Sequence, residues 1–172
     1  LDFLSKTMGA SSGGTLSNGN LEWLGTSNND NIVASISVKS SKWYHELTVG
    51  QNADKLVAGW TTVKEMGNDT ESALIYYNSA GIRDGNKTVV WDSTVTSSLT
   101  FATNDVIGFA LNLDDYFLYV YKNDSLVSKI TLPTDKGDTW IPCCGDSSTT
   151  DASATFNFGQ QSFTYTPPTG YR

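Results

Sequence analysis

The segment "DVIGFALNLDDYFLYVYKNDSLVSKITL", residues 105–132, decides the fold because its apolar side chains recur at every second position. Two acidic or amide pairs, Asp114 with Asp115 and Asn123 with Asp124, interrupt the pattern with residues typical of tight turns. A period of two is that of a strand with one buried face, here formed by Ile107, Phe109, Leu111 and Leu113. The segment therefore predicts three antiparallel strands joined as a meander.

The same alternation recurs outward along the chain, and helical periodicity is hard to find. Further strands are expected in 31–40, 42–49, 55–63, 72–78, 88–92, 139–144 and 154–159. In 31–40 the inward face would be Ile32, Ala34, Ile36 and Val38. Pro142 suits an edge strand or a strand end, because it lacks an N–H donor. Roughly a dozen short strands predict an all-β fold, a sandwich of two antiparallel sheets.

The last twenty residues, "SATFNFGQQSFTYTPPTGYR", are rich in aromatic side chains. Phe156 and Phe158 are expected to point inward from a final strand, and Phe163 and Tyr165 repeat that spacing beyond Gly159. Burying one Phe contributes roughly 1.5–3 kcal/mol to stability. We therefore interpret this tail as part of the fold and not as a binding site.

Composition excludes two classes of partner. The chain has 172 residues, with 18 acidic and 11 basic side chains, a formal charge of -7 and no basic cluster. Such a surface repels a phosphate backbone, so nucleic-acid binding is not expected. No apolar run approaches the ~20 residues that cross a bilayer, so membrane insertion is not expected. Because the sequence starts with Leu1, we expect a piece of a longer polypeptide or a processed product.

Residues that often perform chemistry have structural interpretations here. His45, the one histidine, shares a strand face with Trp43, Leu47 and Val49 and is expected in the core. Cys143 and Cys144 are adjacent, so a strand would point them to opposite faces as two free, buried thiols.

A glycosidase would need two carboxylates about 5–9 Å apart, and no such pair falls on a clear strand. Asp114 and Asp115 are adjacent and explained by a turn. Segments 27–31, 67–71 and 145–151 are rich in oxygen ligands for calcium but lack its ordered spacing. Solvated loops are the simpler interpretation, and the sequence predicts neither enzyme activity nor a metal or cofactor.

Several segments together resemble one known family. In their order and approximate spacing, these segments are similar to the characteristic segments of a SPRY domain, which is the core of the B30.2 fold. The resemblance covers roughly residues 20–172. The segments are "KWYHELTV" (42–49), "LVAGW" (56–60), "NDTESALIYYNSAG" (68–81), "NDVIGFALNLDDYFLYVYKND" (104–124), "WIPCCG" (140–145) and "ATFNFGQQSFTYTPPTGY" (154–171). Asp124 stands where glycine is usual, and Ser162 where proline is usual. The resemblance implies a concanavalin-like jelly roll, with 1–172 as one domain and 1–19 as a lead-in.

The beginning, "TLSNGNLEWLG" (15–25), resembles the opening strand of SPRY domains in bacteriophage structural proteins. SPRY domains are binding modules, so the resemblance implies a non-catalytic recognition or decoration domain of a virion fibre, tail or capsid surface. It would bind a host-surface glycan or protein, contact other virion proteins, and form a homo-oligomer such as a trimer. The alternative is a cytoplasmic SPRY adaptor that docks a short peptide of a partner protein.

By position, the family's ligand contacts map to the loops near 28–31, 76–79 and 145–151. An aromatic that often follows the proline strand in peptide binders is replaced here by Cys144, Gly145 and Asp146, and the polar loop suits sugar hydroxyls better. Trp60, Trp91 and Trp140 are candidates for a stacking platform, with Trp60 and Trp43 favoured as core and Trp91 as exposed. The predicted ligand contacts are Asn28, Asn29, Asp30, Asn31, Tyr76, Tyr77, Asn78, Trp91, Gly145, Asp146, Ser147, Ser148, Thr149 and Asp151.

Overall fold

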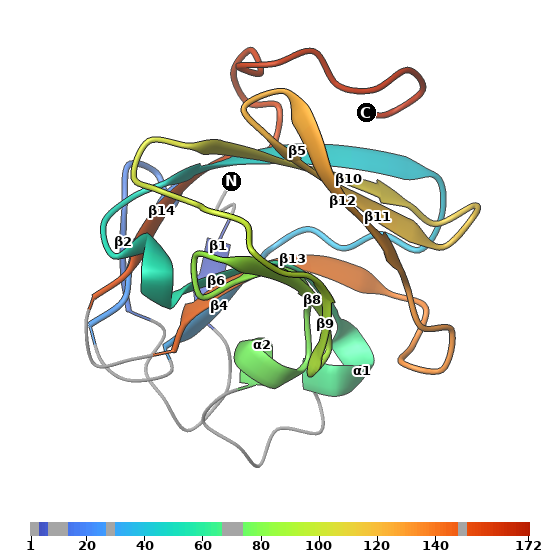
Figure 1. Ribbon diagram of the computed structural model, residues 1–172, viewed down its shortest axis with the longest axis horizontal. Coiled ribbons are helices and arrows are strands. Elements are labelled where there is room, and N and C mark those ends of the chain that lie inside the picture. Colours follow the sequence, from blue (N-terminus) through green and yellow to red (C-terminus); the bar gives the residue numbers. More distant parts are fainter. Residues whose placement is uncertain (1–3, 7–13, 27–29, 67–73, 148–150) are drawn as a thin grey trace.

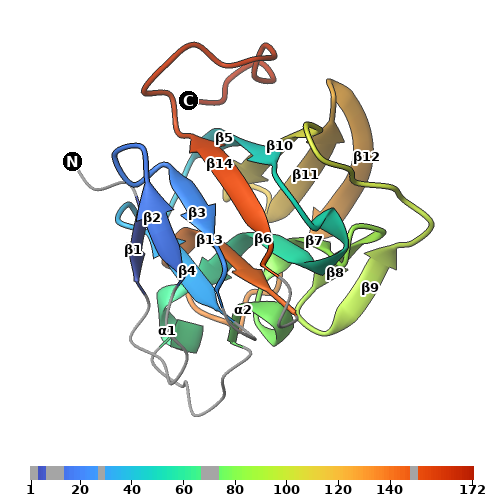
Figure 2. The ribbon, with the colours of Figure 1, turned by 90° about the vertical axis from the view of Figure 1, so that its left-hand side faces the viewer.

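A computed structural model describes residues 4–6, 14–26, 30–66, 74–147 and 151–172. Two antiparallel sheets face each other (Figures 1 and 2). The first has the strand order β1 (Leu4–Lys6), β4 (Asn31–Ala34), β13 (Trp140–Asp146), β6 (Leu56–Thr62), β7 (Ala80–Arg83), β8 (Lys87–Val90) and β9 (Ser93–Thr96). The second has the order β12 (Ser125–Thr131), β11 (Phe117–Lys122), β10 (Val106–Asn112), β5 (Lys42–Val49), β14 (Ser153–Asn157), β3 (Glu22–Leu24) and β2 (Thr15–Ser17). The predicted two-sheet antiparallel β-sandwich is confirmed.

The meander predicted from 105–132 is present as β10, β11 and β12. Between β11 and β12, Asn123 and Asp124 have φ angles of 47° and 69°, the two positive values that a type I′ turn requires. Between β10 and β11, the side-chain oxygen of Asn112 accepts the N–H groups of Asp114 and Asp115. Both acidic or amide pairs therefore form turns.

The core lies between the sheets, and its largest fully buried side chains are aromatic. They include Phe109 of β10, Phe156 of β14, Trp140 of β13 and Trp23 of β3. His45 of β5 belongs to this layer, with its ring centroid 5.1 Å from that of Phe109 and 5.2 Å from that of Trp60. The predicted core position of His45 is confirmed.

Strand β4 differs from the expected half-buried strand. It ends at Ala34, all four of its residues are buried, and Ile36 is 36% exposed instead of pointing inward. The outer face is covered because Val33 packs in a second apolar cluster with Val57, Ile75, Ile141 and Cys143. This cluster lies on the side of the first sheet away from the main core.

The strand predicted for 72–78 is wrong over the residues that the structure describes there. Residues Leu74–Tyr77 form the short helix α2, and two other short helices are η1 (Ala53–Lys55) and α1 (Val63–Met66). Aromatic and β-branched residues favour a strand, but here tertiary contacts decide. The Ile75 side chain fills the second cluster, its N–H donates to the Asn31 side chain, and its carbonyl accepts the Ser79 hydroxyl.

The predicted edge position of Pro142 is also wrong, because β13 lies between β4 and β6. Trp140 exchanges both backbone hydrogen bonds with Val38 on the β4 side, so alternation points the Pro142 nitrogen to that side as well. Pairing with β4 is interrupted there, between the Val33–Cys143 pair and the Val38–Trp140 bridge. A central strand therefore accommodates proline at a gap in the ladder.

Cys143 and Cys144 are free and buried, and they point to opposite sides of β13 as predicted. Cys143 belongs to the second apolar cluster, whereas Cys144 belongs to the main core. Burial raises the pKa of both thiols. Both side chains therefore serve packing as small hydrophobes.

The C-terminal tail, defined as residues 158–172, leaves β14 and passes over the outer face of the second sheet (Figures 1 and 2). Phe156 is buried and stacks on the half-buried Phe158 at 5.4 Å, so the inward placement of this pair is confirmed. Phe163 instead packs outside the sheet, edge to face with Tyr44 at 4.9 Å. The tail thus covers a face that is usually left to solvent in an antiparallel sheet.

Glu46 of β5 holds the tail in place. Its buried carboxylate accepts the N–H groups of Thr164 at 2.7 Å and Tyr165 at 2.8 Å, and the hydroxyl of Tyr44 at 3.2 Å. The chain end is fixed separately, because Arg172 exchanges backbone hydrogen bonds with Lys42 and Tyr44. Hydrogen bonds to a charged acceptor are worth about 1.5–3 kcal/mol each.

We predict that Glu46→Ala lowers the free energy of unfolding by about 2–3 kcal/mol, because the tail loses its charged acceptor. Glu46→Gln should lie between this variant and the unmodified chain, since an amide offers one acceptor oxygen. Urea unfolding measures the effect, with Glu65→Ala in α1 as a control expected within about 0.5 kcal/mol. A Glu46→Ala variant as stable as the control contradicts the proposed clamp.

A second prediction concerns pH. Burial lowers the pKa of His45 to about 3, and neither ring nitrogen has a hydrogen-bond partner among the described residues. The unfolded chain binds this proton near pH 6.5, so stability is complete above that pH and falls as pH is lowered towards 3. At about pH 5 the loss from His45 should be about 2 kcal/mol relative to neutral pH.

His45→Phe keeps an aromatic ring in the core and removes the titrating group. Urea unfolding at neutral pH and at about pH 5 should give a smaller pH-dependent loss for the variant than for the unmodified chain. Comparing the two chains cancels the contribution of carboxylates, which titrate in the same range. Equal losses in both chains would show that His45 is not the source.

Candidate recognition site

The three segments predicted to carry ligand contacts meet at one end of the first sheet. The N–H of Asp30 donates to the Asp146 carboxylate at 3.0 Å, and the N–H of Asp146 donates to the Asp30 carbonyl at 3.1 Å. The Asn31 side chain accepts the N–H of Ile75 at 3.2 Å. These bonds join the segment before β4, the end of β13 and the start of α2.

The side chains that make these connections are buried and support the surface from below. Asp30, Asn31 and Asp146 are each less than 5% exposed. The loop placement of Gly145 and Asp146 is wrong, because both belong to the paired strand β13. A Cβ at Gly145 would lie 2.7 Å from the Asp30 carbonyl oxygen, so only glycine allows this close approach.

The exposed part of this end is built around two tyrosines of α2. Tyr77 is 43% exposed, and its ring lies edge to face against Tyr76 with the centroids 4.9 Å apart. Tyr76 is held on three sides: its hydroxyl donates to Asp84 at 3.1 Å, its carbonyl accepts Arg83 Nη1 at 3.0 Å, and the Arg83 guanidinium lies 4.4 Å from its ring centroid. An exposed aromatic side chain therefore stands on a rigid support.

Asp84 connects this support to the loop that follows β13. Its second oxygen accepts the Ser147 hydroxyl at 3.0 Å, and Lys87 lies 3.0 Å from the carboxylate. Burial, followed by the negative charge of Asp84, raises the pKa of Tyr76, so its hydroxyl stays protonated as a donor. We call Tyr76, Tyr77, Arg83, Asp84 and Ser147 the Tyr77 surface.

Arg83 and Asp84 were not predicted from the sequence. Arg83 is 5% exposed, pairs with Asp92 at 3.3 Å and donates to the Tyr76 carbonyl, so we interpret it as a structural cation. A sequence signal existed in "GIRDG" (81–85), where a turn follows a short apolar strand. Only the fold, however, places this turn against α2.

The other predicted contacts lie around or outside this surface. The Asn78 carbonyl accepts the Thr61 hydroxyl, and the Asp151 carbonyl accepts the side chains of Gln51 and Asn52, which places Asp151 beside η1. Asn28, Asn29, Ser148 and Thr149 lie outside the described residues, as do most of the oxygen-rich segments considered for calcium. The ligand contacts themselves stay a prediction.

The three candidate tryptophans, Trp60, Trp91 and Trp140, do not form an exposed stacking platform. Trp60 and Trp140 are buried in the core. Trp91, expected to be exposed, is half-buried, packs against the core and lies edge to face with Trp140 at a centroid distance of 5.9 Å. Its backbone φ of 51° belongs to the turn that follows β8.

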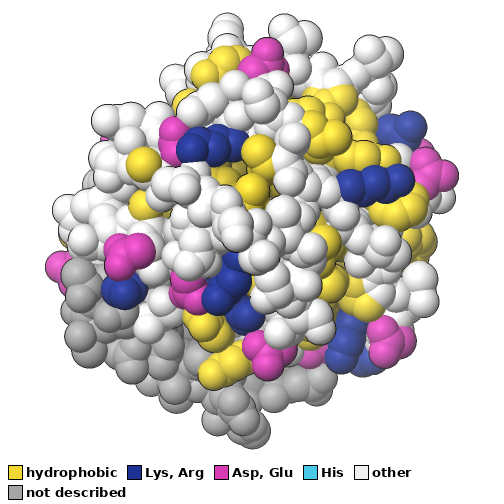
Figure 3. Space-filling model, viewed as in Figure 1, with side chains coloured by type: hydrophobic (Ala, Val, Ile, Leu, Met, Phe, Trp, Pro, Cys, Tyr) yellow, Lys and Arg dark blue, Asp and Glu magenta, His cyan; other side chains and the backbone are white. Residues whose placement is uncertain are grey.

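The distribution of charged and titratable side chains does not indicate a particular reaction at this end. On the face in Figure 3, basic and acidic side chains are interspersed instead of gathered by sign. In the described ranges, no group of three or more His, Cys, Asp or Glu residues could hold a metal ion. Nor does any helix within them have the length and apolar composition to cross a bilayer.

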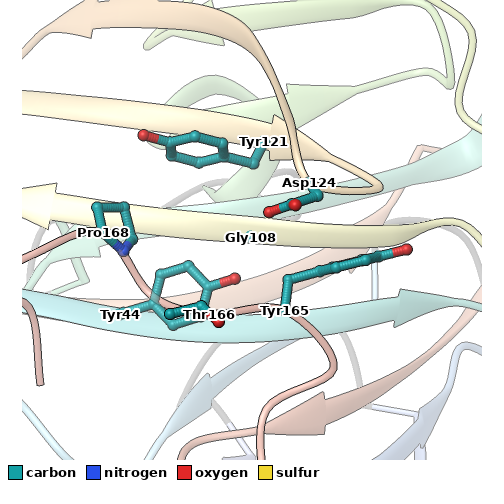
Figure 4. Close-up of a pocket in the computed structure, with 7 residues that line it drawn as sticks. All are labelled: Tyr44, Gly108, Tyr121, Asp124, Tyr165, Thr166 and Pro168. Carbon is teal, nitrogen blue, oxygen red and sulfur yellow. The ribbon is translucent and has the colours of Figure 1, made fainter.

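The structure also contains a pocket that the sequence did not predict. A pocket of about 170 Å³ lies between the second sheet and the C-terminal tail (Figure 4). We call it the tail pocket, and its lining residues are Tyr44, Gly108, Tyr121, Asp124, Tyr165, Thr166 and Pro168. Interpreting the tail as fold alone missed this pocket, because no local pattern encodes the return of the tail over β5 and β10.

Comparison with known proteins supports the fold. No protein-family model matches the chain, and no curated protein matches it either. Among solved structures, the chain is similar to the SPRY domain of human HERC1, with a TM-score of 0.58 and 14% sequence identity. The match covers 77% of this chain and 84% of that one. The chain therefore has the SPRY-type β-sandwich fold that its sequence resembles.

Proposed function

We propose that this chain is a non-catalytic recognition domain that binds another macromolecule through the Tyr77 surface. The observation that carries the proposal is the exposed Tyr77 ring, packed on a Tyr76 that Arg83 and Asp84 hold in place. Binding residues are commonly placed on short connections supported by rigid sheets. Tyrosine is also enriched among the residues that contribute most of the energy at interfaces.

Burial of the only histidine supports a role without catalysis. His45 lies between the sheets with its pKa lowered to about 3, so it is neutral and out of reach of a substrate at neutral pH. Asp114 and Asp115, the adjacent carboxylates, are engaged in a turn with Asn112. A general acid or base must reach its substrate directly or through one water.

In its finer form, we propose that the domain belongs to a bacteriophage virion protein and meets a host-surface glycan or protein. This part rests on the resemblance of "TLSNGNLEWLG" to virion SPRY domains and on the acidic, hydroxyl-rich composition. A tyrosine ring can pack against the apolar face of a sugar, and the nearby Asp84 and Ser147 are of the types that bind sugar hydroxyls. Contacts with other virion proteins and a trimeric assembly belong to the same proposal.

One observation favours the second candidate, a cytoplasmic adaptor that docks a short peptide. The aromatic that often follows the proline strand in peptide binders is absent, but Tyr77 supplies an exposed aromatic from α2 at the same end. A peptide anchor could therefore pack on Tyr77 instead. The two candidates share one surface and differ in ligand class, so one binding experiment separates them.

We predict that Tyr77→Ala weakens binding of a ligand selected from a bacterial glycan array or a displayed peptide library by about tenfold or more. Leu126→Ala on β12 is the matched control, because Leu126 is also an exposed apolar side chain, at 54%. Both variants should keep their stability within about 0.5 kcal/mol. Selection of glycans favours the virion role, and selection of one peptide motif favours the adaptor.

A ligand whose affinity is the same for Tyr77→Ala and for the unmodified chain would contradict the proposed surface. Turnover of the selected ligand by the purified chain would contradict the non-catalytic role. Oligomeric state, measured by light scattering, tests the trimer separately.

A further inference from the structure

The tail pocket is formed by five different parts of the chain. Tyr44 comes from β5, Gly108 from β10, and Tyr121 from β11, while Asp124 belongs to the turn between β11 and β12. Tyr165, Thr166 and Pro168 of the C-terminal tail complete the lining (Figure 4). The C-terminal tail and α2 lie on opposite sides of the sandwich (Figures 1 and 2), so the tail pocket and the Tyr77 surface are separate sites.

The floor of the pocket depends on a residue without a side chain. A Cβ at Gly108 would lie 2.5 Å from the Tyr44 hydroxyl oxygen and 3.0 Å from a carbon of its ring. The Tyr44 side chain therefore lies against the bare backbone of the neighbouring strand. Its hydroxyl is directed to Glu46, the residue that also holds the tail. The same interactions that fix the tail thus shape the pocket.

The electrostatic character of the pocket is negative. Asp124 is the one lining residue with a formal charge, and among the described residues it forms no ion pair with a Lys or Arg. Glu46 lies directly behind Tyr44. The pKa of Tyr121 is raised mainly by burial and then by Tyr119 and Asp124, so its hydroxyl stays neutral beside the Asp124 carboxylate. Such a pocket repels anions and favours a cation.

We propose that the tail pocket binds an organic ammonium group, held by the Asp124 carboxylate and by the aromatic side chains of Tyr44, Tyr121 and Tyr165. Aromatic rings attract cations through their electron-rich faces, and several rings around one site form an aromatic cage for ammonium ligands. Figure 4 shows the three tyrosines and Asp124 grouped around Gly108. The volume of about 170 Å³ is close to that of cavities of ~150 Å³ that accept one benzene molecule, so it suits a single headgroup or side-chain end.

The test uses small probes that differ in charge at nearly constant shape. Choline is titrated against its neutral isostere 3,3-dimethylbutan-1-ol, and the Gly108 amide in a nitrogen–proton NMR spectrum reports on the pocket. We expect saturable shifts with choline and at least about fivefold weaker binding of the alcohol. Nα-acetyl-lysine methylamide, as a third probe, distinguishes a protein side chain from a choline headgroup as the source of the ammonium group.

Asp124→Asn is the most informative variant. Asp124 has a φ of 69°, which asparagine adopts readily, so the turn should be kept while the charge is removed. We expect choline to bind at least about fivefold more weakly. Asp135→Asn, an equal change of charge in the loop at the other end of β12, should bind choline like the unmodified chain.

Tyr121→Leu tests the aromatic contribution and should also weaken choline binding, whereas Tyr121→Phe should retain it. Three results would overturn the proposal: no saturable shift with choline or the lysine probe, equal binding of the neutral alcohol, or unchanged binding in Asp124→Asn. Because Asp124→Asn leaves the sheets untouched, the proposal can be decided even if Tyr121→Leu does not fold.

Discussion

The burial of one carboxylate, that of Glu46, governs how the second sheet is completed. Strand β5 is covered on both faces, with His45 and Leu47 in the core and Tyr44 and Glu46 beneath the tail. A buried carboxylate is unfavourable unless hydrogen bonds replace its lost water. Glu46 receives them from two consecutive tail amides and from Tyr44, so a residue that would be costly alone becomes the anchor of the tail.

The Glu46 constraint shapes one of two different surfaces that the molecule offers. On the first sheet, α2 packs over the second apolar cluster and presents Tyr77 outward above a network of fixed polar groups. On the second sheet, the tail forms a pocket together with tyrosine rings and the exposed Asp124. Both sites combine aromatic side chains with oxygen atoms and rest on paired strands, and neither contains an accessible histidine or thiol. These features underlie the proposal of a recognition role.

Local patterns in the sequence predict what local energetics control. Alternation over 105–132 and its two Asp or Asn turns predict β10, β11 and β12, because one face of each strand is buried and short polar residues suit tight turns. The positive φ angles of Asn123 and Asp124 are an example. The same logic fails at 72–78, where the burial of Ile75 outweighs strand propensity, and at Pro142, where a gap in the pairing with β4 removes the need for an N–H. The three segments of the predicted site do meet at one end of the first sheet. The places of Arg83, Asp84 and the tail pocket, however, depend on contacts between different parts of the fold.

Amide hydrogen exchange tests the role of Glu46 most directly, because it reads the two tail bonds one residue at a time. We predict that the Thr164 and Tyr165 amides are protected from exchange nearly as well as the paired amides of β5. These two amides lie in a segment without regular secondary structure, so the protection would come from Glu46. In Glu46→Ala, this protection should be lost while that of β10 remains. Thr164 and Tyr165 amides that exchange in the unmodified chain as fast as an unstructured peptide would contradict the account.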